Sequence, residues 1–247
     1  LKDPNDIANA KFAELAYGDH PYAYPVNGTT ESVSALTRDD LLAAHKAVLA
    51  QDRVYIGAVG DITPDELGLM IDELLGGLPK TGGPMPPKAN VAIPAGVTVV
   101  DFPTPQSVAI FGHSGIAQQD PDFFAAMTLN QILGGGSFET RLMTEVREKR
   151  GLTYGVYSYL GTRDLANTYM GSVSSANDRI AEAIEVIRAQ WVKAQTEGVT
   201  EEELKNAKTY ITGAYPLRFD GNGPIANILV GMQMLGLPID YIPTRND

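Results

Sequence analysis

Residues 134–160 have the sequence GGGSFETRLMTEVREKRGLTYGVYSYL, and they decide the fold because they join a glycine run, a charged helix and a strand. Ser137 is a suitable N-cap, and basic residues crowd the last turn before Gly151, which predicts an amphipathic helix between the two. After Gly151 the apolar period falls to two, which predicts a strand directly after the helix. The apolar residues of the expected helix recur at Phe138, Leu142 and Val146.

Arg147 near the end of this helix and Tyr154 in the following strand are the candidate functional residues. Strand alternation is expected to place Tyr154 on the same face as Val156 and Ser158, and to place Tyr157 on the opposite face. Because three residues of strand span only about 10 Å, the guanidinium and the phenol are expected to reach one crevice. A basic helix end and a strand tyrosine are also common structural features, so a purely structural role stays open.

Composition indicates an ordinary globular protein of 247 residues, with 44% apolar and 20% charged residues, in one large domain or two smaller ones. No window approaches the roughly 20 apolar residues of a membrane-spanning helix. A net charge of −11 disfavours nucleic acid as a partner and is compatible with a cationic peptide or simply with a soluble surface. Cysteine is absent, which excludes a disulfide framework, a thiol nucleophile and a thiolate metal site. Cytosol and periplasm both remain open as compartments.

The first part of the chain contains one strand that lacks neighbours. Residues 53–60, RVYIGAVG, show little alternation and predict a strand buried on both faces, yet the first 80 residues hold no other convincing strand. Its partners are expected elsewhere, either in the second half or upstream of Leu1, where the chain begins without a signal-like segment, so we expect a piece of something longer. The helices expected around this strand cover residues 5–17, 37–49 and a stretch opened by the capping-box pattern at Thr63.

A proline-rich stretch divides the chain. Residues 79–96 contain five prolines and a Gly-Gly pair, the composition of an extended connector between domains. We therefore expect a first domain portion at 1–80, a linker at 81–95 and a second domain at 96–247.

The second part predicts an α+β fold, an antiparallel sheet covered by helices on one face. One long helix is expected to end at Gly198, and another is expected to start at Thr200 and to break near Pro216 before a last apolar helix. A further helix is expected over 120–133. The expected strands pair 97–102 with 108–112, and 154–160 with 167–174.

Motifs for several kinds of chemistry are missing from the sequence. The three histidines, His20, His45 and His113, form neither H-E-x-x-H nor H-x-x-E-H, so we expect this chain to bind no zinc and assign the three a structural role. No G-x-S-x-G motif occurs. The glycine run at 134–136 matches neither a phosphate loop nor a dinucleotide fingerprint, because no strand immediately precedes it.

The stretch LGGGSFETRLMTEVREKRGLTYGVYSYL, residues 133–160, resembles the second-domain signature of the pitrilysin, insulysin and mitochondrial-processing-peptidase family of H-x-x-E-H zinc peptidases. Residues 18–79, from GDHPYAYPVNG to LLGGLP, are similar to the end of that family's first domain. The resemblance implies a metallopeptidase fold of two related α+β domains, of which the first is incomplete here. Its zinc-binding part is then absent, which explains the strand without neighbours.

In this family an arginine and a tyrosine seven residues apart face the zinc and bind the substrate, and Arg147 and Tyr154 have that spacing. Arg150 and Tyr157 share the spacing, but Tyr157 is expected on the opposite strand face, which favours the first pair. The resemblance implies that a zinc-activated water attacks a peptide carbonyl, with the motif glutamate as base. Tyr154 would then donate to the developing oxyanion, and Arg147 would hold a substrate carbonyl or support the tyrosine.

The resemblance implies the substrate-positioning, non-zinc portion of a zinc metallopeptidase that cleaves peptides or unfolded segments. Zinc would come from missing upstream residues or from a partner subunit, in a homodimer or a heterodimer, and the chain alone is expected to be inactive. The alternative is a non-enzymatic structural or assembly subunit with the same fold, because fold does not determine function.

Overall fold

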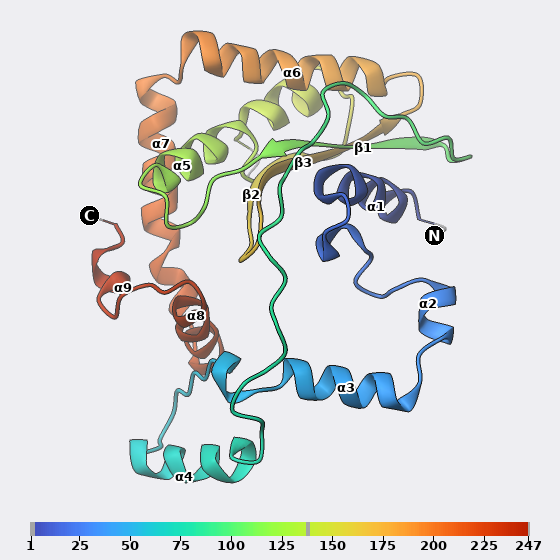
Figure 1. The fold of residues 1–247 in the computed structure, drawn as a ribbon. Coiled ribbons are helices and arrows are strands. Elements are labelled where there is room, and N and C mark those ends of the chain that lie inside the picture. Colours follow the sequence, from blue (N-terminus) through green and yellow to red (C-terminus); the bar gives the residue numbers. More distant parts are fainter. Residues whose placement is uncertain (1–2, 137–138, 247) are drawn as a thin grey trace. The chain divides into compact units, whose positions relative to one another are not determined.

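The computed structural model describes residues 3–136 and 139–246 (Figure 1), and its contacts divide the chain into two compact units. The first unit comprises Leu1–Asn27 and Pro86–Tyr210, and the second comprises Gly28–Met85 and Ile211–Asp247. Each unit is thus assembled from two separate stretches of chain. The boundary expected at 81–95 was based on proline and glycine composition and not on contacts, and it stays a prediction.

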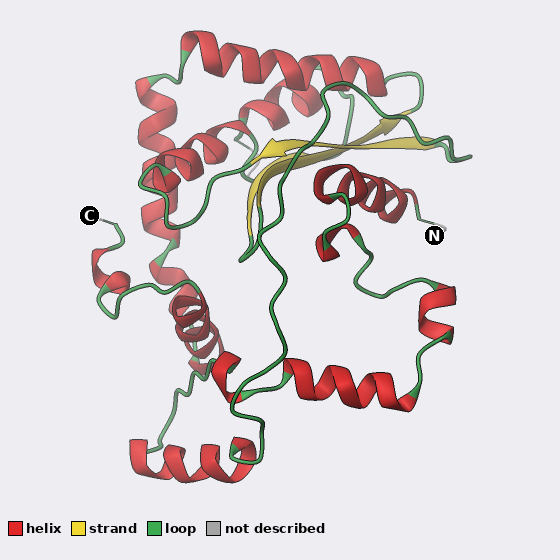
Figure 2. Cartoon of the chain, in the orientation of Figure 1, coloured by secondary structure: helices red, strands yellow, loops and turns green. Residues whose placement is uncertain are grey.

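The first unit is built on a three-stranded antiparallel sheet, shown in yellow in Figure 2. β3 (Asn167–Ala176) is the central strand, between β1 (Gln106–Ser114) and β2 (Val156–Thr162). The predicted pairing of the two later strands is confirmed, with Val156 opposite Val173. The fold class is therefore the expected α+β arrangement with an antiparallel sheet.

Helices α5 (Phe123–Leu133) and α6 (Ile180–Glu197) contact the sheet from one side. As predicted, α6 stops at Gly198, whose φ of 74° is one that glycine adopts without steric cost. Alternate side chains of β1 pack against the resulting core, as the two-residue strand period requires. The core consists of Leu142, Met143, Val146, Leu152, Val156, Val173, Ala183 and Ile187.

The opposite face of the sheet receives α1 (Pro4–Tyr17), which the sequence predicted as a helix but not as part of this layer. Phe12 and Ala16 of α1 are buried in a second cluster that includes Ile110 of β1 and Met170 of β3. The extended segment 89–93 joins the same cluster and donates a hydrogen bond from Ala89 N–H to the Leu165 carbonyl, at 2.8 Å. Part of the expected linker therefore belongs to the first unit and packs within it.

Two expected strands are not formed, and both predictions are corrected. Residues 97–102 belong to no strand, and Val97 and Val99 are exposed. The expected hairpin would have paired residues 97–102 with 108–112 around a turn that contains Pro103 and Pro105. Proline has no backbone N–H to donate to the hydrogen bonds between the two strands. Residues 53–60 also belong to no strand, because no other described residues lie beside them as a sheet.

Helices are the only regular elements among the described residues of the second unit, and extended stretches of chain join them. The capping box expected at Thr63 is present before α4, and α3 begins with a further capping box at Thr37, where the sequence predicted a helix start. The Arg53 guanidinium ties the chain after α3 to the stretch after α4, because it donates to the carbonyls of Ala47 and Gly83. The unit's α-helices are α2 (Thr30–Ser34), α3 (Arg38–Val48), α4 (Pro64–Leu75), α8 (Asn222–Met234) and α9 (Tyr241–Thr244). Between α6 and α8 runs α7 (Glu201–Ala214).

Candidate functional site

Arg147 lies in a π-helical turn, Met143–Glu148, and is half-buried. The N–H of Lys149 donates to the carbonyl of Thr144 at 3.0 Å, five residues back, so the turn is wider than an α-helical one. The regular helix expected from the N-cap is corrected here, while its first residues, Ser137 and Phe138, lie outside the described residues. Such turns are frequent at functional sites, and periodicity alone does not reveal them.

The widened turn packs on the hydrophobic core of the first unit. Leu142 and Val146 are fully buried, as their apolar spacing predicted. The turn ends against Leu152, whose side chain is buried in the same core and whose N–H donates to the Val146 carbonyl at 3.0 Å. The turn that bears Arg147 is thereby packed on the core of the first unit.

Tyr154 precedes β2 rather than belonging to it, and 89% of its surface is exposed. The expected alternation with Val156 and Ser158 is therefore wrong, since both of those residues are buried. The cause is a turn at Thr153, whose hydroxyl accepts from the Gly155 N–H at 3.1 Å and donates to the Ser174 carbonyl of β3 at 2.7 Å. This turn leaves the Tyr154 ring and hydroxyl in solvent.

The alternative pair, Arg150 and Tyr157, has different surroundings. Arg150 donates to both the carboxylate and the carbonyl of Glu145, each at 2.7 Å. Tyr157 stands opposite the buried face of β2, as expected, and its ring stacks on Tyr159 with centroids 6.4 Å apart. Arg150 is therefore committed to a contact within the chain.

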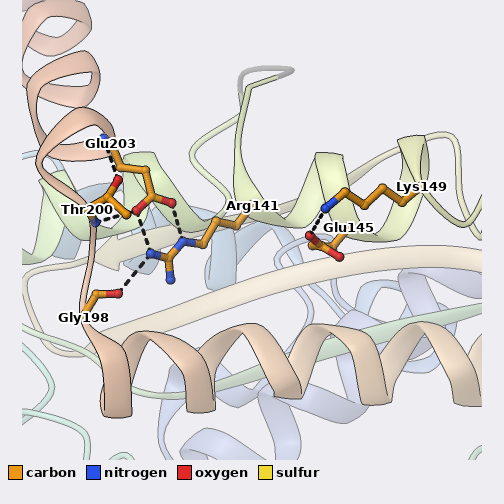
Figure 3. Close-up of polar contacts among 6 residues, drawn as sticks. All are labelled: Arg141, Glu145, Lys149, Gly198, Thr200 and Glu203. Atoms are coloured by element: carbon orange, nitrogen blue, oxygen red, sulfur yellow. Dashed lines mark hydrogen bonds and ion pairs between the residues drawn. The ribbon is translucent and has the colours of Figure 1, made fainter.

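Glu145 pairs with two basic residues at the end of the turn. Its carboxylate also accepts from Lys149 at 2.6 Å (Figure 3). Hydrogen bonds from Lys149 and then from Arg150 lower the pKa of Glu145 from its usual value. Lys149 and Arg150, two of the three basic residues at the helix end, thus share one carboxylate as their partner.

Arg141, just before the widened turn, is joined to the start of α7 by a bidentate ion pair with Glu203 (Figure 3). The Nε–Oε1 and Nη2–Oε2 distances are 2.6 and 2.7 Å, and Nη2 also donates to the Gly198 carbonyl. The same carboxylate accepts from the Thr200 N–H, and the Glu203 N–H donates to the Thr200 hydroxyl, so the two residues form a capping box at the predicted helix start. The Arg141 hydrogen bond is the main cause that lowers the pKa of Glu203 to about 2.

A buried polar chain supports the glycine run beside the site. Tyr169 donates to the Ser158 hydroxyl, which donates to Asn130, both at 2.8 Å, and burial raises the pKa of Tyr169 to about 12. The Ser158 N–H donates to the Gly134 carbonyl at 2.7 Å. A Cβ at Gly134 would lie 2.5 Å from the Ser158 hydroxyl oxygen, so close approach explains this glycine.

The described residues do not provide a fit for zinc. Within residues 3–136 and 139–246, no three histidine, aspartate or glutamate side chains gather as metal ligands. His20 lies 2.9 Å from the Pro87 carbonyl through Nε2, and its Nδ1 accepts from Tyr22 N–H. His113 stacks on Tyr169. In the same residues, no helix combines the length and the apolarity needed to cross a membrane.

Comparisons with known proteins agree with this fold. A family model described as the peptidase M16 inactive domain matches residues 35–211. An uncharacterized zinc protease of Streptomyces coelicolor is 29% identical over 91% of the chain, and a non-peptidase homolog of Helicobacter pylori is 24% identical over 96%. A crystal structure of a peptidase M16 inactive domain from Pseudomonas fluorescens, 30% identical, superposes with a TM-score of 0.85 and covers 98% of this chain and 57% of that one.

The chain spans about half the length of the curated relatives that it matches. It covers 50% of the Streptomyces protein and 55% of the Helicobacter protein.

Proposed function

Because the chain belongs to the M16 peptidase family through its inactive domain, we propose that it is the substrate-positioning, non-zinc portion of a metallopeptidase that cleaves peptides or unfolded segments. The observation that carries the proposal is the exposed Tyr154, which follows in the chain soon after the widened turn that bears Arg147. Zinc would belong to upstream residues or to a partner subunit, since the described residues offer no fit for it.

The two side chains suit the recognition of a peptide carbonyl. A phenol hydroxyl donates a single directed hydrogen bond, which strengthens as charge develops on a carbonyl oxygen during hydrolysis. A guanidinium offers a planar fork that is always charged and can hold a neighbouring carbonyl of an extended peptide. Because Tyr154 is exposed and not packed in the core, it is accessible to a substrate that approaches from solvent.

The test replaces Tyr154 with Phe in an enzyme reconstituted with its zinc-bearing portion. The substitution removes only the hydroxyl, so we expect kcat to fall by about 10² to 10³ with a smaller change in KM. Arg147→Lys keeps the charge but loses the fork, and it should impair turnover together with substrate binding. Steady-state kinetics on a fluorogenic peptide measures both effects.

Tyr157→Phe is the matched control. This tyrosine is half-exposed on the face of β2 that points away from the buried residues Val156 and Ser158. The substitution should leave both constants unchanged. If Tyr154→Phe kept full activity while Tyr157→Phe lost most of it, the substrate-positioning role would pass to Arg150 and Tyr157. Two silent variants would remove the substrate-positioning role altogether.

A second candidate function is a non-enzymatic structural or assembly subunit. It is favoured by the Helicobacter relative, which is named a non-peptidase homolog and matches nearly the whole chain. Under this alternative, a purified natural complex that contains the chain shows no peptidase activity, and loss of the chain disrupts assembly. Hydrolysis of an unfolded protein by that complex, inhibited by a zinc chelator, would exclude it.

A further inference from the structure

Tyr154 lies in a short segment between the widened turn and β2, which we call the tyrosine loop (residues 149–155). Exposed loops are usually the mobile parts of a protein, because few contacts oppose their opening. In this loop the residues on both sides of Tyr154 form hydrogen bonds, whereas 89% of the surface of Tyr154 itself is exposed. The loop thus combines a backbone that is held with a tyrosine that stands in solvent.

Two buried hydroxyl groups join the loop to strand β3. The Thr153 hydroxyl donates to the Ser174 carbonyl at 2.7 Å. The Ser175 hydroxyl donates in the reverse direction, from β3 to the Leu152 carbonyl. Thr153 and Ser175 are 9% and 2% exposed, so the loss of either bond would leave a buried polar group unpaired. Two adjacent residues of the loop are therefore bonded to two adjacent residues of β3.

The Thr153 hydroxyl also acts across Tyr154. It accepts from the Gly155 N–H at 3.1 Å, so one hydroxyl restrains the backbone on both sides of the tyrosine. A tyrosine side chain has only two rotatable torsions, and holding its backbone therefore leaves little freedom to its hydroxyl.

The earlier residues of the loop are held as well. The Leu152 N–H donates to the Val146 carbonyl at 3.0 Å. The guanidinium of Arg179, at the start of α6, donates to the Arg150 carbonyl at 3.2 Å. These hydrogen bonds join the loop to α6 and to the widened turn that bears Arg147.

We propose that Thr153 and Ser175 are positioning residues, which hold the tyrosine loop on β3 so that the Tyr154 hydroxyl is presented at one fixed place to an approaching substrate. The proposal rests on the proposed function for the role of that hydroxyl. A tyrosine that is held before the substrate arrives avoids the entropy cost of ordering it during binding. It also keeps the donor aligned with the carbonyl oxygen on which charge develops.

The first measurement follows the loop in the whole chain by NMR and needs no peptidase activity. The order parameter of the Tyr154 N–H should be about 0.85, as in a rigid backbone, and should fall below about 0.6 in Thr153→Val. Hydrogen exchange of the Gly155 N–H should become about tenfold faster or more in the same variant, because its acceptor is lost. Thr153→Ser retains a hydroxyl and should keep the wild-type values.

Two substitutions on β3 complete this measurement. Ser175→Ala removes the second hydroxyl without changing the loop's own sequence, and it should also lower the order parameter of Tyr154. Thr168→Val is the matched control, since Thr168 is a buried threonine at the other end of β3. It should leave Tyr154 and Gly155 unchanged. Urea unfolding followed by the fluorescence of Trp191 checks that each variant is folded.

The second measurement uses the reconstituted enzyme and a double-mutant cycle with Tyr154→Phe. Thr153→Val should lower kcat by about tenfold or more with little change in KM, because the donor is no longer held at the reacting carbonyl. In the Tyr154→Phe background the same substitution should change kcat by less than about twofold, since the hydroxyl that Thr153 positions is already absent. Thr153→Ser should keep most of the turnover.

The outcomes separate this proposal from the proposed function. Unchanged order at Tyr154 and unchanged exchange at Gly155 in both Thr153→Val and Ser175→Ala would overturn it, because the loop would not depend on the two hydroxyls. An equal loss of kcat with and without the Tyr154 hydroxyl would also overturn it, since Thr153 would then act only through the stability of the fold. If the loop loosened as expected but Tyr154→Phe kept full activity, the holding of the loop would be confirmed and only the proposed function rejected.

Discussion

Glu203 connects the first turn of α7 to Arg141, 62 residues away in the chain, and its pKa is lowered to about 2. A carboxyl with a folded-state pKa below its unfolded value stabilises the protein above the unfolded pKa, near 4.5, and loses that contribution as pH falls toward 2. We expect Glu203→Gln to lower the free energy of unfolding by about 1.5 to 3 kcal/mol at pH 7. The difference from wild type should shrink between pH 4.5 and pH 2.

Trp191 provides the measurement, because it is the only tryptophan and its ring packs against Phe111 and Tyr169. Urea unfolding followed by its fluorescence therefore reports the first unit. Glu185→Gln is the control, since its pair with Arg188 is largely exposed and should contribute less than about 1 kcal/mol. An equal loss for both variants would contradict the prediction.

The predictability of single residues depended on how far away their partners lie. The capping box at Thr63 was predicted because its two partners, Thr63 and Glu66, lie three residues apart. The Arg141–Glu203 pair left no local signal, since its members are 62 positions apart. The face of Tyr154 was missed because the Thr153 turn depends partly on Ser174 of β3.

At the level of elements, Gly134 fixes how closely α5's end approaches β2. Gly134→Ala places a Cβ 2.5 Å from the Ser158 hydroxyl and 2.9 Å from Leu142, in the middle of the buried polar chain. We expect a loss of about 1 to 3 kcal/mol in the free energy of unfolding, as for overpacked cores. Urea unfolding reported by Trp191 checks it. Gly155→Ala meets nothing within 4 Å, and it should change stability by less than about 0.5 kcal/mol.

The elements that were predicted correctly carry their own start and stop signals. Helix α6 is bounded at its end by Gly198, and the β2–β3 pair alternates over adjacent segments. The strand expected at 53–60 was wrong as an element because strands require neighbours, and sequence pattern cannot supply them. The π-helical turn was missed because the four-residue spacing of Leu142 and Val146 fits an α-helix as well as the wider turn.

For the whole molecule, the separation of the three histidines leads to a prediction about zinc binding. His20 and His113 each lie within hydrogen-bonding distance of a backbone carbonyl, and His45 stands on the separate helix α3. We expect the chain alone to retain no stoichiometric zinc after dialysis, because a tight site needs at least three converging ligands. Atomic emission of the dialysed protein measures this. One zinc per chain that disappears on changing any histidine would reveal a site that the described residues do not show.

The two units also predict how the chain comes apart under a protease. Helix α1 is buried with Ile110 and Met170, so residues 1–27 should stay attached to the sheet even when the chain is cut behind them. Residues 28–85 should be lost first, because α3 and α4 bury none of their residues and offer little resistance to local opening. Brief digestion at low protease concentration should therefore leave the α1 fragment coeluting with a fragment that begins near Pro86.

Phe12→Ala, which shrinks the contact between α1 and the sheet, should release the α1 fragment. A resistant fragment that begins near Val97 and lacks α1 would instead support the linear boundary at the proline-rich stretch.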